Sequence, residues 1–586
     1  MPATKSSPKR SSRRWLENQV NRFHHRVAYA EALPQLSLLG FVCGLLTAVV
    51  AILFRLSFET PLNLLLPSGS ESFEALPVEA RFLLPVCGAL CLGLILHFLK
   101  PESRPVGVGH VIDRMQHHQS HLPAKNALLE FFGSAIAIIT GNSVGREGPA
   151  VHLGAACSSL FGQYLKLPNN SLRILVSCGV AAAIAASFNT PLAGVIFAME
   201  VVLMEYTISG FIPVIIAAVT GAFLFRAVFG DQQAFSLPLI EMGSLWEIPF
   251  LILCGLAIGL VATAMLNLAQ GCSRFADKPV LLKMIAAGLL TGAVATVLPQ
   301  VMGVGYDTLE QAMLGQLGFW LLAAIVIAKL VLSTVSVSLG MPGGTIGPSL
   351  VIGVCMGGWL GFIGGMINPE QASTPGFYAT LGMSAMMGAV LNAPLAALIV
   401  MLELTYNPNL LLPSMLTIVT ATLTARTASR LPGLFSIGRD RSRYTSPVFQ
   451  MLSRAGVTSL MELNFAHHSH LIRPEAAREI LEKKPVWLVI EDVGEPKYIL
   501  KPVDLARHME AQDPLSWDED TRIDLLKIPA ERWRLHPIHS RATLQEALIL
   551  MRQKDGRAVY ITQPASPLMS EVAGIVTRES IDNYYQ

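Results

Sequence analysis

A glutamate set between glycine and proline residues is the side chain best placed to do chemistry in this sequence. It is Glu147, in the stretch Gly-Arg-Glu-Gly-Pro at 145–149. Proline fits the first turn of a helix, glycine allows a ligand to approach closely, and the N–H groups of a helix start attract anions. We therefore expect an anion beside Arg146, Glu147 and Gly148, with the Glu147 carboxylate competing for the same position as a gate. The alternative is a glutamate that caps the helix and pairs with Arg146.

Two further stretches repeat this design. Gly-Gly-Thr-Ile-Gly-Pro at 343–348 would open a helix in the second half of the chain, and Gly-Val-Gly at 107–109 would open a third. Three helix starts aimed at one point would hold a dehydrated anion without any full positive charge, and weakly enough to release it. The anion-binding residues expected from these two stretches are Gly107, Val108, Gly109, Thr345, Ile346 and Gly347.

A second motif is also duplicated. Phe-Asn-Thr-Pro-Leu-Ala-Gly at 188–194 is echoed by Leu-Asn-Ala-Pro-Leu-Ala-Ala at 391–397, and each is followed by an acidic residue, Glu200 or Glu403. Matched glycine and proline breaks in apolar segments indicate the duplicated halves of a transporter and mark its site near the bilayer midplane. We expect broken helices at four breaks rich in Gly, Pro, Asn and Ser, rather than ordinary loops between tilted helices. These breaks lie at 141–149, 187–194, 340–348 and 391–394.

Composition places most of the chain in a membrane. Hydrophobic residues make up 52% and charged residues 14%, and the mean hydropathy is +0.50, whereas soluble proteins are about 25% charged. A disordered or wholly soluble chain is therefore excluded. The charge distribution predicts a basic cytoplasmic arm over 1–34, a transmembrane domain over 35–438 with repeats at about 35–235 and 245–438, and a cytoplasmic domain over 439–586.

The charged tail has the pattern of two α/β units joined by an acidic, exposed link at 513–522. The expected strands are 486–490, 558–562 and 572–576, and the expected helices are 476–482, 503–509, 544–552 and 578–584.

Histidine and cysteine residues do not predict a metal site or another cofactor. No cysteines form a CxxC pair, and the histidines at 117–121 and 467–470 are expected in solvated loops. His110 lies inside the first helix start, where it either packs or titrates near neutral pH and tunes an entrance. Nucleic acid is not an expected partner beside membrane spans.

Together the motifs at 141–149, 188–194, 343–348 and 391–394 resemble those of the CLC family of chloride channels and proton/chloride exchangers, and they occur in the family's order. The resemblance implies an α-helical polytopic membrane fold with inverted repeats and broken helices. It also implies a homodimer with one anion pathway per subunit, and Glu147 as the gating glutamate. The α/β tail resembles a pair of CBS domains, which many family members carry on the cytoplasmic side.

Three departures from the family pattern bear on mechanism. Val108 stands where the family usually has a serine hydroxyl, and Phe435 matches a tyrosine. We therefore expect weaker central anion binding and poorer discrimination among halides and nitrate. Val201 stands where exchangers of the family usually place an inner proton-relay glutamate, directly after Glu200. This favours passive conduction, because coupling would need water or Glu200 to carry protons towards Glu147.

Asp504 and Thr577 match nucleotide-binding positions of a CBS pair, each in an incomplete motif, because Lys501 and Ser580 depart from the family pattern. We therefore expect a dimerising and stabilising module, with adenine-nucleotide binding as the alternative.

The sequence thus predicts a glutamate-gated transporter of chloride or another small monovalent anion, channel-like or weakly coupled to protons. A proton/chloride exchanger is the alternative. An intramembrane enzyme is not favoured, because the sequence has no HExxH, Ser/His or GxGD-type arrangement. The expected location is the bacterial inner membrane, with both termini cytoplasmic and the basic arm against anionic lipid headgroups.

Overall fold

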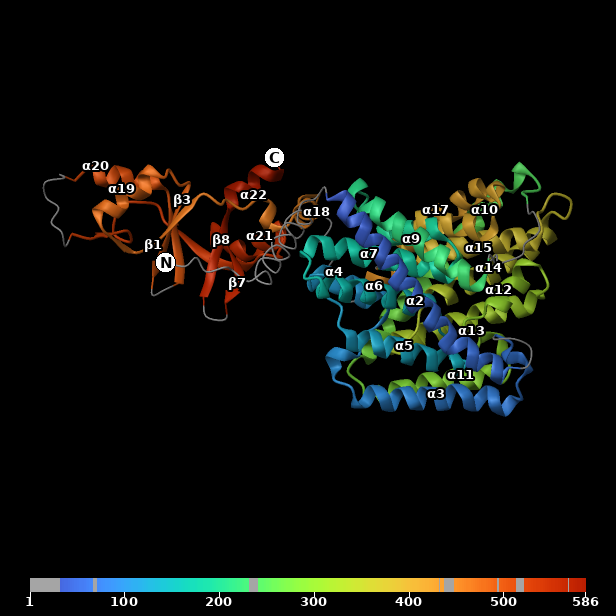
Figure 1. The fold of residues 1–586 in the computed structure, drawn as a ribbon. Helices are drawn as coiled ribbons and strands as arrows, with labels where there is room; N and C mark the ends of the chain where they lie inside the picture. Colours follow the sequence, from blue (N-terminus) through green and yellow to red (C-terminus); the bar gives the residue numbers. More distant parts are fainter. Residues whose placement is uncertain are drawn as a thin grey trace. The chain divides into compact units, whose positions relative to one another are not determined.

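The computed structural model describes residues 32–66, 71–230, 241–429, 431, 433–436, 447–492, 495–512, 521–566 and 569–585. Contacts divide the chain into two compact units (Figure 1). The larger, called here the membrane unit, comprises Leu33–Leu165 and Leu172–Arg441. The described parts of the smaller, called here the tail unit, fall mainly in Ser442–Gln586.

Eight described helices of the membrane unit are long and apolar enough to cross a bilayer. They are α2 (Leu33–Leu65), α3 (Val78–Phe98), α7 (Asn169–Phe188), α9 (Ile208–Phe229), α10 (Ile248–Cys272), α13 (Phe319–Ser338), α14 (Ile346–Ile367) and α17 (Leu411–Ala428). Helices are the expected form because hydrocarbon offers no partner for backbone N–H and C=O groups.

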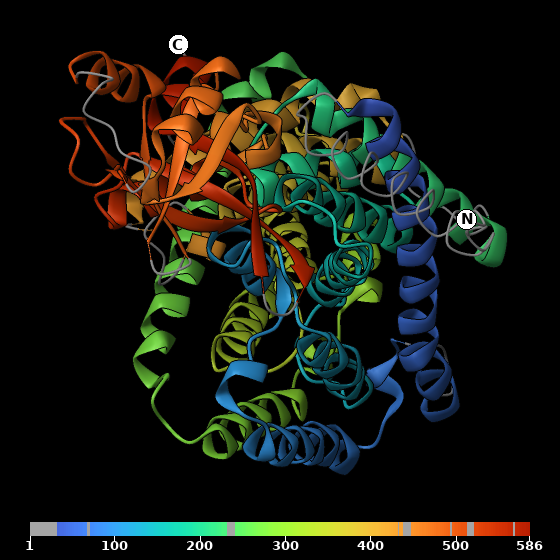
Figure 2. The same ribbon diagram turned by 60° about the vertical axis from the view of Figure 1, so that its left-hand side comes forward.

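Shorter helices connect and surround these spans. They are α4 (Gly107–His117), α5 (Ala124–Ile139), α6 (Glu147–Tyr164), α8 (Pro191–Phe197), α11 (Val280–Ala295), α12 (Tyr306–Met313), α15 (Pro375–Leu391) and α16 (Pro394–Thr405). Helices α3 and α11, one from each half of the chain, lie side by side in both views (Figures 1 and 2). Helices α14 and α15 form the most extensive helix pair and are largely buried.

The predicted helix breaks are confirmed. Helix α5 ends at Ile139 and α6 begins at Glu147, and α13 ends at Ser338 before α14 begins at Ile346. The two Asn-x-Pro motifs also break in the same way. Asn189 and Asn392 both adopt left-handed backbone angles, with φ of 60° and 55°. The prolines that follow occupy the first turns of α8 and α16, where their missing N–H groups cost no hydrogen bond.

The acidic residue after each Asn-x-Pro motif caps the helix of the other copy. The Glu403 carboxylate accepts hydrogen bonds from the N–H groups of Leu192 (3.0 Å) and Ala193 (2.7 Å) at the start of α8. The Glu200 carboxylate accepts from the equivalent residues at the start of α16, Leu395 (3.3 Å) and Ala396 (2.7 Å). Because equivalent residues bind each other, the two halves are related by a local two-fold arrangement, as an inverted repeat requires.

The tail unit contains a six-stranded sheet in the order β1-β3-β4-β6-β7-β8. Its strands are β1 (Phe465–Ser469), β3 (Trp487–Asp492), β4 (Glu495–Leu500), β6 (Trp533–His539), β7 (Ala558–Ser566) and β8 (Met569–Thr577). Its helices are α18 (Pro447–Ser453), α19 (Pro474–Glu482), α20 (Pro502–Glu510), α21 (Leu544–Gln553) and α22 (Arg578–Tyr585), and a two-stranded sheet joins β2 (Leu471–Ile472) to β5 (Ile523–Asp524).

The sheet repeats one pattern. In each half a parallel pair precedes an antiparallel hairpin, and the halves meet where β4 pairs with β6 at Tyr498 and Arg534. Separate hydrophobic cores lie under each half, and a shared core around Trp487, Ile499 and Leu535 joins them. This arrangement fits the expected CBS-like pair.

The expected strands and helices of the tail unit are confirmed, while five of its described strands were missed. They are β1, β2, β4, β5 and β6, which are short or carry charged residues. The expectation of a solvated loop is wrong for His467 and His468, because both lie on β1, opposite Val489 and Ile490, and for His117, because it is the last residue of α4. Their side chains are nevertheless exposed. Most of the expected acidic link at 513–522, and nearly all of the basic arm, lie outside the described residues.

Candidate anion-binding site

A cavity of about 250 Å³ lies in the membrane unit where three helices begin. Helices α4, α6 and α14 contribute Gly107, Gly148 and Ile346 to its lining. The remaining lining residues are Val106, Val108, Gly109, Ala269, Ser273, Val337, Ser338, Gly343, Gly344, Thr345, Leu434 and Phe435. The structure thus brings together the three glycine-rich stretches that the sequence analysis singled out.

The starts of these helices give the cavity its positive character. Within the described residues, none of the N-cap side chains of Val106, Arg146 and Thr345 forms a capping hydrogen bond to its helix. The first N–H groups of a helix lack partners inside the helix, and they carry about half a positive charge together. Three such ends around one cavity favour an anion there.

The loops before α6 and α14 are tied to each other by their backbones. Gly145 N–H donates to the Gly344 carbonyl oxygen, and Gly344 N–H donates to the Gly145 carbonyl oxygen, both at 2.7 Å. These two residues occupy equivalent positions in the duplicated motif. A Cβ atom on Gly145 would lie 2.6 Å from a Glu147 carboxylate oxygen and 2.7 Å from Pro348, so only glycine fits this contact.

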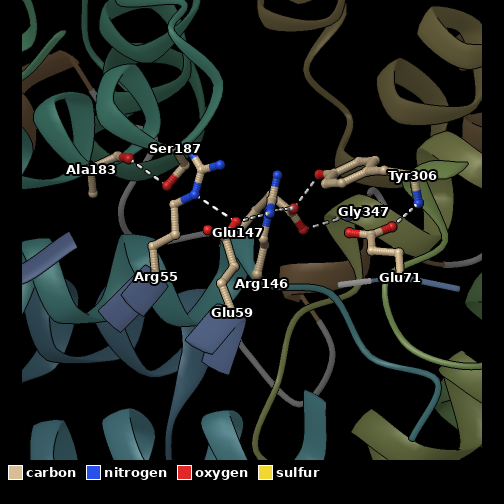
Figure 3. Close-up of polar contacts among 9 residues, drawn as sticks. All are labelled: Arg55, Glu59, Glu71, Arg146, Glu147, Ala183, Ser187, Tyr306 and Gly347. Atoms are coloured by element: carbon tan, nitrogen blue, oxygen red, sulfur yellow. Dashed lines mark hydrogen bonds and ion pairs between the residues drawn. The ribbon is translucent and has the colours of Figure 1, made fainter. Parts of the chain in front are cut away.

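Glu147 is buried, with 1% of its side chain exposed, and its carboxylate binds a helix start (Figure 3). Its Oε2 accepts a hydrogen bond from the backbone N–H of Gly347 at 2.9 Å. Its Oε1 accepts a hydrogen bond from the Tyr306 hydroxyl. The Glu147 carboxylate therefore occupies an N–H group of the α14 start that an anion would also use.

The Arg146 side chain has its described partners outside the cavity lining. Its guanidinium lies over the Tyr306 ring, 4.6 Å from the ring centroid, and its nitrogens lie 3.6 Å from Glu59 and 3.8 Å from Glu147. Glu59 in turn accepts from Arg55 at 2.6 Å (Figure 3). The cavity lining, as far as the chain is described, does not include Arg146. The Arg146 guanidinium thus contacts Glu147, Glu59 and Tyr306, while the expected contact of residue 146 with the anion stays a prediction.

Tyr306 and Lys329 are site residues that the sequence analysis missed. Tyr306 opens α12, and its backbone N–H donates to Glu71 at 2.6 Å (Figure 3). The Lys329 amine is fully buried and donates to the carbonyl oxygens of Val301 (3.2 Å) and Gly303 (2.9 Å), in the turn before α12. A single charge inside the apolar α13 run was the available signal, because intramembrane charges are expensive and usually have a purpose.

Phe435 and Val108 line the cavity, as their match to the central positions predicts. Neither offers a hydroxyl group, and Gly347 contributes through its N–H bond to Glu147 rather than as a lining residue. The cavity also has hydroxyl-bearing residues that were missed, Ser273 and Ser338. Its walls therefore combine backbone N–H groups, apolar side chains and a few hydroxyls.

Glu200 and Val201 lie on the π-helical turn η3 (Ala198–Leu203) that follows α8. The Glu200 carboxylate is the cap of α16 described above, and Val201 is buried. The structure thus gives Glu200 a structural bond to the second half of the chain. Its weakly favoured role in a proton pathway stays a prediction.

The two residues matched to nucleotide-binding positions make local contacts in the tail unit. Asp504 lies in the first turn of α20, 3.7 Å from Arg507. Thr577 Oγ1 accepts from the Ser580 N–H at 3.2 Å and thereby caps α22. They sit in different halves of the sheet. A search of the described residues finds no group of three or more His, Cys, Asp or Glu side chains suited to a metal ion.

Comparisons with known proteins agree with these motifs. The model of a family described as voltage gated chloride channel matches residues 87–426. The putative chloride channel protein ClcB-like from Ralstonia nicotianae is 30% identical over 377 residues, covering 63% of this chain and 88% of that protein. The H(+)/Cl(-) exchange transporter ClcA from Vibrio cholerae is 28% identical over 400 residues, covering 66% of this chain and 85% of the relative.

Solved structures share the fold. A slow cyanobacterial Cl-/H+ antiporter superposes with a TM-score of 0.60 at 19% identity, covering 69% of this chain and 96% of that structure. A eukaryotic CLC transporter superposes with a TM-score of 0.59 at 18% identity, covering 94% of this chain and 99% of that structure. The second match therefore extends into the tail unit.

Proposed function

This chain belongs to the voltage gated chloride channel (CLC) family, and we propose that it conducts chloride or a similar small monovalent anion through the cavity at the three helix starts. With its family and its eight apolar helices, it is a multi-pass integral membrane protein that transports anions. The proposal adds the pathway, the gate and the degree of proton coupling.

One observation carries the proposal: the Glu147 carboxylate binds the Gly347 N–H at a helix start of the cavity region. A carboxylate is itself an anion, so it marks a position where negative charge is stabilised by backbone N–H groups. When Glu147 is protonated or swings away, that N–H group is released for chloride. Glu147 is therefore proposed as the gate that competes with the transported anion.

Conduction is proposed to be channel-like or only weakly coupled to protons. Proton coupling needs a titratable group that carries protons between Glu147 and the cytoplasmic side. Val201, at the position matched to the inner glutamate of exchangers, has no such group. The neighbouring Glu200 carboxylate is engaged as the cap of α16 by the Leu395 and Ala396 N–H groups.

A proton/chloride exchanger is the second candidate, because relatives such as the Vibrio cholerae protein are named exchange transporters. The two candidates differ in one measurement. The reversal potential is measured with purified protein in vesicles under a proton gradient. If the protein is a channel, this potential depends on the chloride gradient alone. A reversal potential that moves with the proton gradient would establish exchange.

The anion site can be tested directly. Crystals soaked in bromide, examined by anomalous scattering, are expected to show density between residues 107–109, 148 and 344–346. Chloride-loaded vesicles are expected to release chloride only when the protein is present. Protein-independent release, or bromide absent from the cavity, would contradict the proposal.

Further parts of the proposal follow the family. The protein is proposed to form a homodimer with one pathway per subunit in the bacterial inner membrane, with cytoplasmic termini and lipid contacts along its apolar helices. The tail unit is proposed to stabilise the dimer, while adenine-nucleotide binding at Asp504 and Thr577 is less favoured. The Thr577 hydroxyl supports this ranking, because it is engaged in capping α22.

A further inference from the structure

A cluster of three buried titratable side chains lies outside the Glu147 site. Glu130 on α5 and His152 on α6 are fully buried, and His110 on α4 is 8% exposed. His152 Nδ1 lies 3.2 Å from Glu130 Oε2, and His152 Nε2 lies 3.0 Å from His110 Nδ1. The imidazole of His152 therefore stands between a carboxylate and a second imidazole, in one continuous row.

This row ends at the cavity. Glu130 Oε2 also accepts a hydrogen bond from the N–H of Gly107 at 2.5 Å, and Gly107 is the first residue of α4 and part of the cavity lining. Glu130 Oε1 accepts from the Ser134 hydroxyl at 2.8 Å. The carboxylate charge is thus held at the helix start that faces the anion, where it opposes anion binding.

We propose that Glu130, His152 and His110 form a buried proton-binding site whose occupancy is linked to anion binding at the α4 start, a proposal that rests on the anion transport inferred above. With Glu130 ionised and both imidazoles neutral, the cluster has one negative charge. A proton taken from water onto an imidazole makes it neutral. The chemistry is proton binding alone, and the proton returns to water when it leaves.

Burial explains why a proton is needed. A carboxylate removed from water is costly unless hydrogen bonds and a positive charge compensate it. Glu130 has two hydrogen bonds, from Gly107 and Ser134, and the nearest group able to become positive is His152. His152 Nδ1 lies close to Glu130, but its geometry does not form a hydrogen bond. The contact therefore stabilises the Glu130 charge most when His152 is protonated, because the two side chains then form an ion pair.

The contact between the imidazoles lets the proton shift within the row. A neutral imidazole has one N–H donor and one acceptor nitrogen, so His110 and His152 can exchange donor and acceptor roles across their 3.0 Å contact. His110 is the only one of the three with measurable exposure among these described side chains. It is therefore where a proton from water would enter.

Other titratable and charged groups lie on the elements around the cluster. The elements packed on α4, α5 and α6 are α2, α3, α14, η2 (Pro101–Ser103), η3 and η8 (Leu434–Ser436). Besides the cluster itself, α4, α5, α6 and these elements together carry Cys43, Arg55, Glu59, Glu79, Arg81, Cys87, Cys91, His97, Glu102, Asp113, Arg114, His117, Lys125, Glu147, Cys157, Tyr164, Glu200 and Cys355.

Three carboxylates in this set could bind a proton as Glu130 does, and each has a described partner. Glu147 is bonded to Tyr306 and Gly347, and Glu200 to the start of α16. Asp113 pairs with His117 at 3.2 Å. The described contacts therefore assign compensation of the Glu130 charge to His152.

The direction of the linkage follows from charge. A proton on the cluster removes a negative charge beside Gly107, so anion affinity rises as pH falls. By reciprocity, anion binding draws in a proton. If one proton accompanies one anion, affinity changes by up to about tenfold per pH unit within the titration range.

The test is chloride titration calorimetry of the purified full-length protein, in two buffers with different ionisation enthalpies. The difference in heat counts the protons taken up per chloride bound. Wild type is expected to take up protons as it binds chloride. Glu130→Gln and His152→Gln are expected to lose the part of this uptake that Glu147 does not supply, and Glu130→Gln is expected to bind chloride with a pH dependence set by Glu147 alone.

Matched controls are Glu102→Gln and His118→Gln, which change exposed residues of the same types and are expected to keep the wild-type uptake. His110→Gln serves if His152→Gln does not fold. Proton uptake that is undiminished in Glu130→Gln and in a folded histidine variant would overturn the inference while leaving anion transport intact. If the wild type binds no chloride at any pH, the proposed function fails as well, and that result is distinct because no binding heat is seen.

Discussion

The two halves of the membrane unit have the same acidic residue at one pair of equivalent positions and different residues at another pair. Glu200 and Glu403 match, and each caps a helix of the opposite half. Glu147 corresponds to Ile346, so only the first half carries a carboxylate at the start of its pore-facing helix. That carboxylate binds Gly347, the residue of the second half that corresponds to Gly148.

The difference teaches which acidic residues hold the fold and which serve transport. A carboxylate that caps a helix is present in both halves, because both halves have the same helix to cap. A carboxylate present in one half alone creates a single gate, and the equivalent backbone N–H of the other half binds that gate. Glu147 supplies the gate, and the Gly347 N–H supplies the receptor.

Removal of the unequal charge is expected to have the largest effect. Glu147→Gln keeps the shape of the side chain and removes the charge that competes with the anion. Chloride flux in vesicles is expected to rise by at least about tenfold at neutral pH, equivalent to about 1.4 kcal/mol. The part of the pH dependence of chloride flux that comes from protonation of Glu147 should disappear. Unchanged flux together with an unchanged pH profile would remove Glu147 from the gate.

The receptor side of the pair can be disturbed almost as strongly. A Cβ atom on Gly347 would lie 2.6 Å from Glu147 Oε2, so Gly347→Ala should displace the carboxylate. We expect a severalfold change in flux and a new pH profile. Gly365→Ala is the matched control on the same helix, because a Cβ there has no described heavy atom within 4 Å. Equal effects of the two variants would show general damage to α14.

The hydroxyl that holds the gate should contribute less. Tyr306→Phe removes one hydrogen bond to Glu147 and leaves the ring under Arg146. A hydrogen bond to a charged group is worth about 1.5–3 kcal/mol. We expect single-channel openings, or flux, to increase severalfold because the carboxylate leaves more easily. Tyr378→Phe, which removes a tyrosine bond to Glu247 away from the cavity, should leave gating unchanged.

The two helix-capping glutamates, Glu200 and Glu403, should contribute equally to stability. Glu200→Gln and Glu403→Gln each weaken one helix cap, and caps contribute about 0.5–2 kcal/mol. Thermal unfolding in detergent should show similar losses of stability for the two variants. If Glu200→Gln instead abolishes proton movement while Glu403→Gln does not, Glu200 is a relay and the symmetry argument fails for it.

The smallest effect is expected from restoring hydroxyl groups at the cavity. Val108→Ser and Phe435→Tyr each add one donor to the lining. A neutral hydrogen bond contributes about 0.5–1.5 kcal/mol, so chloride affinity should rise about two- to tenfold per variant. Selectivity for chloride over nitrate should rise in parallel when measured by competition. A fall in affinity for both variants would mean that the anion lies elsewhere in the cavity.

Sequence motifs predicted the membrane fold and the meeting of the three helix starts well, because glycine and proline punctuation acts locally. The breaks before Pro191 and Pro394 follow from backbone rules that any observer of the sequence can apply. The pairing of Gly145 with Gly344 could not be predicted, because it depends on how two distant halves pack.

Side-chain partners could not be predicted from the motifs. Arg146 lies next to Glu147 in sequence, yet its guanidinium turns to Glu59 and Tyr306, because a cation gains more from a carboxylate and an aromatic face than from an apolar cavity. Tyr306 and Glu130 carry no motif. Only tertiary packing shows that one holds the gate and the other reaches Gly107.

The paired backbones of Gly145 and Gly344 also bear on biosynthesis. A ribosome delivers Gly145 to the bilayer long before Gly344 emerges, so the nascent first half has an unpaired loop at its centre. The permeation route is therefore completed only when α14, which begins two residues after Gly344, has been inserted. Two separately expressed fragments, cut between the halves, should each be inert and should recover transport only when they reassemble in the same cell.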